Sequence, residues 1–316
     1  MLALLTDPTF AGFLSASMRL AIPIMLAALG GVFAERSGVL NIGLEGMMLV
    51  GAFTGFLAAY ASGHLVVGVV AAVLAGAATG LLLGVYTITL GSNQVVVGIA
   101  VNLLAVGVTS FFYRLAFGAG TDRPRVDAFV APDLGPLADL PVIGPLLFRQ
   151  DMLAYGALAL VFIAWFVLAK TRFGLDIRAV GEHPAAAETL GLDVARIRFQ
   201  AIAISGGLAG LGGAFLSLAA TGVFLDGMTA GRGYIALAIL ILGRRHPLGV
   251  LFASLLFGAA DALQLRAQIL PTGVPFQFLL MLPYVLTIIV LAGFVGRSGA
   301  PAALGVPFRR GNAEKE

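Results

Sequence analysis

Cysteine is absent from this chain of 316 residues, and charged side chains are scarce. The absence of cysteine excludes disulfides, thiolate metal sites and cysteine nucleophiles. Charged residues make up 11% of the chain and hydrophobic residues 59%, whereas soluble domains are about a quarter charged. With a mean hydropathy of +1.01, this composition predicts an integral membrane protein without a soluble domain.

The chain also lacks the residues of several common functional sites. It contains no G-x4-GK[ST] phosphate-binding signature, so we do not expect it to bind nucleotide. Its histidines, His64, His183 and His246, all fall between predicted spans, which leaves no histidine relay or metal site. No clustered nucleophile or acid–base set is visible. We therefore expect a chain that is not itself an enzyme.

Long apolar runs predict about nine (eight to ten) transmembrane helices. A hydrocarbon core of about 30 Å needs about 20 apolar residues in helical form. The seventh run is too short to cross unaided, and residues 1–15 are expected to lie on the membrane surface, with a tenth span as the alternative. The candidate spans are 16–34, 42–61, 65–90, 94–117, 152–170, 200–222, 233–243, 247–266 and 277–296.

The positions of the 19 Lys and Arg residues orient these spans. With the N-terminus outside, twelve of them fall in cytoplasmic loops or the tail, while the 118–150 loop keeps three. Short loops rich in Lys and Arg stay in the cytoplasm. We therefore predict an extracytoplasmic 118–150 loop, a cytoplasmic 171–199 loop and a cytoplasmic 297–316 tail.

The two halves of the chain resemble each other. SGVLNIGLEGMMLVGAF (37–53) resembles FLDGMTAGRGYIALAIL (224–240), and GVVAAVLAGAATGLL (68–82) resembles GVLFASLLFGAADAL (249–263). The matching segments run in opposite directions, which indicates inverted repeats, 16–117 and 200–296, linked by the span 152–170. In transporters with such repeats, short or Gly-interrupted segments at matching positions point to the pathway. Here they are 41–46 and 229–234.

Polar side chains in and beside these spans are the candidate solute contacts. Glu45, paired with Arg232 in the repeat, would cost about 2.5–3.5 kcal/mol at mid-helix, so we expect it to face protein or water. Glu45 and Asp261 are the only carboxylates expected inside spans, too few for proton coupling. Amides and tyrosines suit neutral solutes; the alternative is that they cap broken helices or join helices. The predicted pathway residues are Asn41, Glu45, Asn93, Gln94, Asn102, Tyr234 and Asp261.

A basic polar segment, 171–199, separates two hydrophobic spans. Its centre, GEHPAAAETLG (181–191), has Pro184 at a helix start and Gly191 as a stop signal. This pattern predicts a short, exposed helix on the cytoplasmic side. Because the chain has no nucleotide site, a docking helix of this kind implies an energy source on another polypeptide.

Three segments, ERSGVLNIGLEGMML (35–49), GEHPAAAETLGLDV (181–194) and FQAIAISGGLAGLGGAFL (199–216), resemble the permease subunits of ABC importers. The similarity is greatest to nucleoside and simple-sugar permeases served by basic-membrane-protein-type binding lipoproteins, which are relatives of ribose permeases. It covers residues 16–296 and implies an all-α membrane protein similar to type II ABC importers. The residues implied in ATPase coupling are Gly181, Glu182, Pro184, Ala185, Ala186, Ala187 and Gly191.

The resemblance also implies partners in the bacterial cytoplasmic (inner) membrane. They are a second homologous permease forming a heterodimer, a tandem ATPase that binds ATP and Mg, and an extracytoplasmic substrate-binding lipoprotein. No cofactor and no nucleic acid is expected on this chain. The expected function is a pore-forming importer subunit for a neutral solute, a nucleoside or a simple sugar. A secondary transporter with inverted repeats and a membrane-embedded enzyme are the alternatives.

Overall fold

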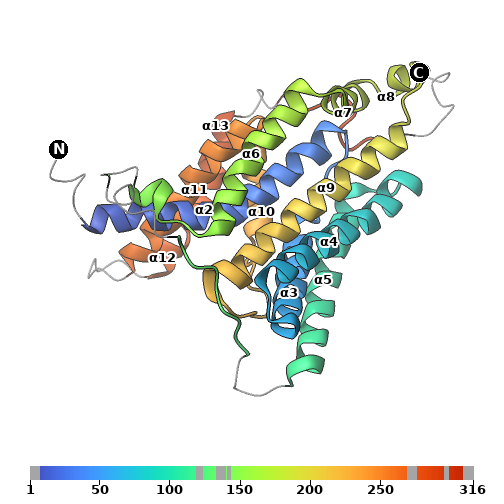
Figure 1. Cartoon of the computed structure of the whole chain (residues 1–316). Coiled ribbons are helices and arrows are strands. Elements are labelled where there is room, and N and C mark those ends of the chain that lie inside the picture. The colour runs from blue at the N-terminus through green and yellow to red at the C-terminus, as the bar shows by residue number, and fades with distance from the viewer. Residues whose placement is uncertain are drawn as a thin grey trace.

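A computed structural model describes residues 8–118, 124–132, 140, 144–268, 276–294 and 299–308, and over these residues the protein is helical, without strands (Figure 1). π-Helical turns follow two of the helices and precede α6. The elements are α2 (Pro8–Arg36), α3 (Leu44–Ser62), α4 (Leu65–Gly84), η1 (Val85–Thr89), α5 (Gln94–Phe117), η3 (Gly144–Phe148), α6 (Met152–Lys170), α7 (Arg172–Glu182), α8 (Pro184–Thr189), α9 (Val194–Ala214), η4 (Phe215–Thr221), α10 (Arg232–Leu242), α11 (Pro247–Ala267), α12 (Phe276–Leu280) and α13 (Leu282–Phe294).

Seven helices within the described ranges are long and apolar enough to cross a membrane. They are α2, α3, α4 with η1, α5, α6, α9 with η4, and α11. The bounds predicted for α5 and α6 are confirmed. The short seventh segment is α10, with 11 residues, and the ninth falls on α12 and α13, its residues 295–296 lying outside the described residues. The number of nine crossings therefore stays a prediction.

The first helix begins earlier than the sequence suggested. Helix α2 runs without interruption for 29 residues from Pro8, a residue that suits the first position of a helix. Residues 8–15 thus continue the first span, and the expectation of a separate surface segment was wrong for them. At 1.5 Å per residue the helix is about 43 Å long, which exceeds a hydrocarbon core of about 30 Å.

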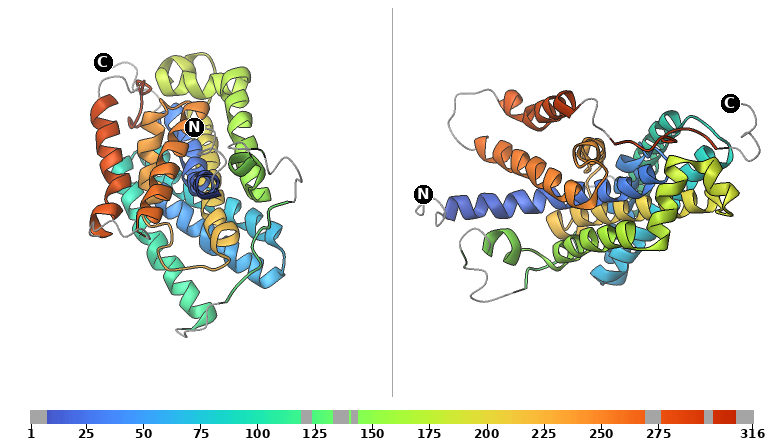
Figure 2. Two further views of the ribbon diagram at one scale, coloured as in Figure 1. Left: turned by 90° about the vertical axis from the view of Figure 1, so that its left-hand side faces the viewer. Right: turned by 90° about the horizontal axis from the view of Figure 1, so that it is seen from above.

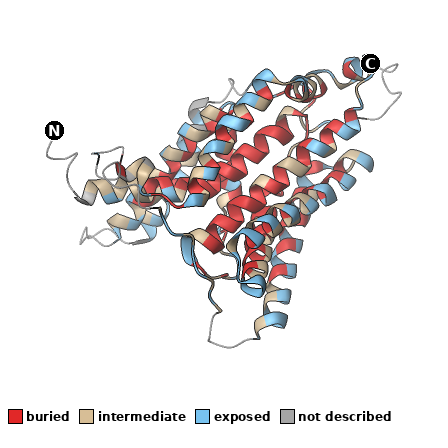
Figure 3. Cartoon of the chain, viewed as in Figure 1, coloured by how far each residue is buried: buried red, intermediate tan, exposed pale blue. Residues whose placement is uncertain are grey.

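Helices α2 and α9 form the centre of the protein. Viewed along α2, the other helices surround it (Figure 2, left), and buried residues follow the C-terminal half of α2 and most of α9 (Figure 3). The apolar stretches of both are 83% buried, against 22% for α4 and 28% for α5 and α6. The outer helices therefore offer apolar surface to lipid or to a partner subunit.

The helix contacts of the two halves correspond. Helix α9 packs against α3 and α4, while α2 packs against α10 and α11. Helix α3 also contacts α4 and α5, and α10 contacts α11 and α13. Exchanging α2, α3, α4 and α5 for α9, α10, α11 and α13 converts each of these contacts into another that is present.

Glycine permits the close contact between α4 and α9. A Cβ added at Gly80 would lie 2.6 Å from the carbonyl oxygen of Ile202, and one at Gly76 would collide with the carbonyl of Gly206. Small residues on facing membrane helices let the backbones approach and pack closely. The seam between α4 and α9 therefore has no room for side chains at these positions.

We predict that Gly80→Ala lowers the thermal unfolding midpoint of the detergent-solubilised protein. Alanine favours a helix by about 1 kcal/mol over glycine, but overpacking costs about 1–3 kcal/mol, and the obstructing atom belongs to the backbone. The matched control is Gly156→Ala in α6, where an added Cβ meets nothing within 4 Å. It should leave the midpoint unchanged or raise it. Equal midpoints for the two variants would contradict the packing argument.

Candidate functional site

Helix α3 begins among buried residues and α10 among half-buried ones, and neither has an N-cap side chain of its own. The residues in front of them are Gly43 and Gly231, and Gly231 has a left-handed backbone with φ 82°. Helices α5, α6 and α9, by contrast, are each capped by the residue before them, Asn93, Asp151 and Asp193. The first amides of α3 and α10 must therefore find partners elsewhere.

The carboxylate of Glu45 provides those partners for α10. One oxygen accepts hydrogen bonds from the Thr229 hydroxyl at 2.6 Å and the Gly231 amide at 2.8 Å, and the other accepts from the Gly233 amide at 2.6 Å. The start of a helix carries partial positive charge, which favours a carboxylate there. Glu45 thus joins the first turn of α3 to the start of α10.

Asn102 of α5 completes this junction. Its side-chain oxygen accepts from the Gly46 amide at 2.8 Å, in the first turn of α3. Its amide nitrogen donates to the Ile42 carbonyl and to the Tyr234 hydroxyl, both at 3.0 Å. One side chain therefore connects α3, α5 and α10.

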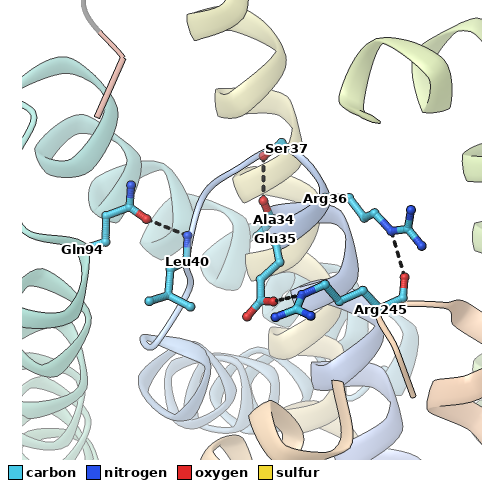
Figure 4. A network of polar contacts seen from close by, with 7 residues as sticks. All are labelled: Ala34, Glu35, Arg36, Ser37, Leu40, Gln94 and Arg245. Carbon is cyan, nitrogen blue, oxygen red and sulfur yellow. Dashed lines mark hydrogen bonds and ion pairs between the residues drawn. The ribbon is translucent and has the colours of Figure 1, made fainter. Parts of the chain in front are cut away.

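The turn before α3 is fixed by two further amides. Asn41, 1% exposed, accepts from the Gly43 amide at 3.0 Å and donates to the Ser205 hydroxyl of α9 at 2.9 Å. Gln94 accepts from the Leu40 amide at 2.6 Å (Figure 4). These contacts anchor the turn 37–43 to α9 on one side and to α5 on the other.

The seven predicted pathway residues do not form a single site. The structure links Glu45, Asn102 and Tyr234 around the two helix starts, and Asn41 and Gln94 hold the adjoining turn. Of the linked three, Tyr234 is about half exposed.

Two predicted pathway residues stand apart from this group. Asn93 is exposed and caps α5, accepting from the Val95 and Val96 amides. Asp261 lies beside a separate cavity of about 290 Å³, together with Arg232 and Gln264.

Sequence reasoning missed a buried ion pair. Glu35 and Arg245 are 3% and 4% exposed. The Nε of Arg245 lies 2.5 Å from Oε2 of Glu35, and the pair joins the end of α2 to the turn between α10 and α11 (Figure 4). The expectation that only Glu45 and Asp261 lie inside spans was wrong, because α2 continues to Arg36. Across the described ranges, no group of His, Asp and Glu residues could hold a metal ion.

The basic segment folds into α7 and α8, and α8 begins at Pro184 as predicted. Four of the seven predicted coupling residues are exposed: Glu182, Ala185, Ala186 and Gly191. Gly181 and Ala187 are buried beneath them, and Pro184 is half-buried. Sequence reasoning missed Leu190, which is 83% exposed, more than any other large apolar side chain in the described ranges. A single leucine in a polar loop produces no periodic signal.

The C-terminal strap, defined here as residues 301–308, holds this surface in place. The Ala303 amide donates to the Gly181 carbonyl and the Gly305 amide to the Gly38 carbonyl, both at 3.0 Å. Beneath the strap lies Arg198, 1% exposed, which donates to the Ser37 carbonyl at 3.1 Å and the Val306 carbonyl at 3.2 Å. The strap therefore ties the ends of α2, α7 and α9 together.

Comparisons with known proteins agree with this all-helical arrangement. Residues 13–291 match a family described as branched-chain amino acid transport system permease component. The chain belongs to this permease family. It is a pore-forming permease subunit of an ABC importer and a multi-pass protein of the bacterial inner membrane, and it has no catalytic role of its own. No solved structure matches the chain.

Among known permeases, the chain is 42% identical to the guanosine ABC transporter permease protein NupQ of Bacillus subtilis, over 94% of this chain and 96% of the relative. It is 37% identical to the nucleoside ABC transporter permease protein NupC of Lactococcus lactis, over 90% and 93%. It is 39% identical to the putative glucose ABC transporter permease protein TsgC13 of Haloferax volcanii, over 82% and 78%. The first two organisms each have a second relative, NupP and NupB, at 29% and 26% identity.

We predict that Glu45→Gln lowers the thermal unfolding midpoint of the purified permease. A glutamine amide nitrogen cannot accept a hydrogen bond, so at least one N–H at the start of α10 loses its partner. A hydrogen bond to a charged group contributes about 1.5–3 kcal/mol. The control is Asp226→Asn, an exposed carboxylate that accepts one hydrogen bond from Ser110. It should change the midpoint little, and an equally small change in Glu45→Gln would exclude the capping role.

Proposed function

We propose that the chain forms one half of the pore of an ATP-driven nucleoside importer. The observation that carries this proposal is the 42% identity to a guanosine permease along 94% of the chain. The junction of α3, α5 and α10 supports it, because the half-exposed Tyr234, bonded to Asn102, offers a neutral hydroxyl. Simple sugars are the second candidate, favoured by the relative named as a putative glucose permease.

The solute path is proposed to pass the starts of α3 and α10. Irregular backbone at membrane depth is tolerated beside protein or a water-filled cavity, and Tyr234 is exposed there. A groove of about 450 Å³ lies farther along α3 and α5, toward the predicted outer side, and is lined by Phe53, Thr54 and Phe112 among others. Aromatic rings there suit stacking with a nucleobase. A solute-bound structure with the solute far from both helix starts would refute this placement.

The two sets of corresponding helices are proposed to be inverted repeats. The support is the exchange of contacts between α2–α5 and α9, α10, α11 and α13, which matches the sequence similarity of 37–53 to 224–240. The repeats would be residues 16–117 and 200–296, with α6 as the linking span. A structure of the assembled transporter tests this: the sets should superpose about an axis in the membrane plane, and superposition about the membrane normal would contradict inversion.

The partners are proposed from the paired relatives and from the chain's own lack of an ATP site. NupP and NupQ occur in one organism, and NupB and NupC in another, which favours a heterodimer with a second permease. ATP and Mg would be bound by a tandem ATPase in the cytoplasm, and the solute would be delivered by an extracytoplasmic lipoprotein. Purification of a stable homodimer that transports without a second permease would contradict the heterodimer.

The ATPase is proposed to bind the exposed face of α8 and the residue that follows it. Ala185, Ala186 and Leu190 give this face a small apolar surface, while the buried Gly181 and Ala187 hold it from beneath. The hydrogen bonds of the strap to Gly181 and Gly38 hold this face in position when a partner binds. Leu190 is the side chain best placed to enter a groove on the ATPase.

We predict that Leu190→Glu weakens the affinity of the purified ATPase for the permease about tenfold or more. Burying a leucine contributes about 1.5–3 kcal/mol, and 1.4 kcal/mol is tenfold in affinity. The matched control is Val130→Glu, because Val130 is 81% exposed and lies in the loop predicted to be outside. It should leave ATPase affinity unchanged. Unchanged ATPase affinity in Leu190→Glu would refute the proposed ATPase-binding surface. A loss of affinity in Val130→Glu alone would show that the predicted membrane orientation is inverted.

A further inference from the structure

A small basic cavity lies between the end of α2, the last turns of α6, the helix α7 and the turn that joins α10 to α11. Its volume is about 160 Å³. None of the predicted pathway or coupling residues lines it. Polar and aromatic side chains from four parts of the chain meet there: Arg36, Trp165, Arg178, Arg245 and His246, with Pro247 beside them.

Two of the three arginines form no ion pair within the described part of the chain. Arg245 is balanced by its ion pair with Glu35. Arg36 donates through Nε to the Arg245 carbonyl at 3.0 Å, and Arg178 through Nε to the Gly174 carbonyl at 3.2 Å. No carboxylate in the described part of the chain lies within ion-pair distance of Arg36 or Arg178. Both guanidinium groups therefore have N–H donors to offer an anion.

No carboxylate is among the described residues that line the cavity. Burial lowers the pKa of His246, and the positive charge of Arg36 lowers it further. Glu182 acts electrostatically on Arg36 from α7, but its carboxylate accepts a hydrogen bond from the Ala302 amide. Helix α11 begins at Pro247, and a helix start favours anions.

The cavity lies at a depth where phospholipid headgroups are found. Trp165 stands five residues before Lys170, the end of α6, or about 7.5 Å along the helix. Tryptophan is enriched at the membrane–water interface. Its neighbours Phe162 and Phe166 are 56% and 55% exposed on the apolar surface of the same helix. In the predicted orientation this end of α6 meets the cytoplasmic leaflet, which carries anionic lipids.

We propose that this cavity binds the phosphate group of an anionic phospholipid from the cytoplasmic leaflet. Arg36 and Arg178 present forked N–H donors that match phosphate oxygens, and the acyl chains lie along α6 beside Phe162 and Phe166. The bound phosphate connects α2 and α6 to α7, the helix from which the coupling surface continues. Inorganic phosphate has the same chemistry, but the depth of the cavity and the apolar surface beside it favour a lipid.

The chain's single tryptophan makes this proposal directly measurable. Trp165 is the only tryptophan and lines the cavity, so its fluorescence reports on the lipid next to it. The purified permease is reconstituted into phosphatidylcholine vesicles that contain phosphatidylglycerol or phosphatidylcholine with brominated acyl chains, since bromine quenches tryptophan. Half-maximal quenching should need about 25-fold less brominated phosphatidylglycerol than brominated phosphatidylcholine, because each of the two unpaired arginines contributes about fivefold.

Variants separate the cavity from general surface charge. Arg178→Gln removes one guanidinium and leaves the Glu35–Arg245 pair intact, so the preference should fall about fivefold. The control Arg196→Gln changes an exposed arginine at the start of α9, outside the cavity, and should keep the full preference. No preference in the wild type, or the same preference in Arg178→Gln, overturns the proposal. If inorganic phosphate reduces the quenching and the wild type shows no preference for phosphatidylglycerol, the cavity binds free phosphate and the lipid proposal is overturned.

Discussion

The carboxylate of Glu45 joins α3 to the start of α10, and the arrangement of the proposed solute path depends on this contact. Backbone amides at membrane depth have no water to bond with, so a helix that begins inside the protein needs partners from another segment. Helix α10 obtains them from Glu45 in α3, and α3 obtains one from Asn102 in α5. Helices α3 and α10 are thereby fixed against each other. Asn102 bonds to the hydroxyl of the half-exposed Tyr234, and Glu45 bonds to the amide of Gly233, the residue before it.

A continuous set of contacts links this junction to the proposed ATPase surface. The strap bonds to Gly181 at the end of α7 and to Gly38 in the turn before α3. Arg198 bonds to Ser37 in the same turn, and Asn41 and Gln94 fix that turn beside the start of α3. We infer that a displacement of α8 reaches the solute path through the turn 37–43. The protein itself contributes position and neutral hydrogen-bonding groups, while the energy is proposed to come from a partner ATPase.

The apolar periodicity and end signals of the sequence predicted α5 and α6 at their observed bounds, because each has a capping residue in front and a long apolar run behind. They also predicted the start of α8 at Pro184. The start of α2 was missed. Residues 8–15 are too few to form a span of their own, and nothing in their sequence indicated that they extend the helix that follows. The burial of Glu35 and Arg198 was missed, because burial of a charge depends on partners far away in the sequence. Asn93 and Asp261 are polar residues near spans like Asn102, and only the packing separates them from the helix junction.

The central claim is that the starts of α3 and α10 lie beside the path of the solute. The chain has no cysteine, so Tyr234→Cys can be labelled selectively in the assembled transporter with a small, hydrophilic thiol reagent. The account predicts that guanosine, supplied with the binding protein and ATP, slows modification at position 234. The control is Tyr86→Cys, since Tyr86 has a similar exposure of 45% but lies in η1, away from the junction. Solute-independent modification at position 234, or equal protection at both positions, would contradict the account.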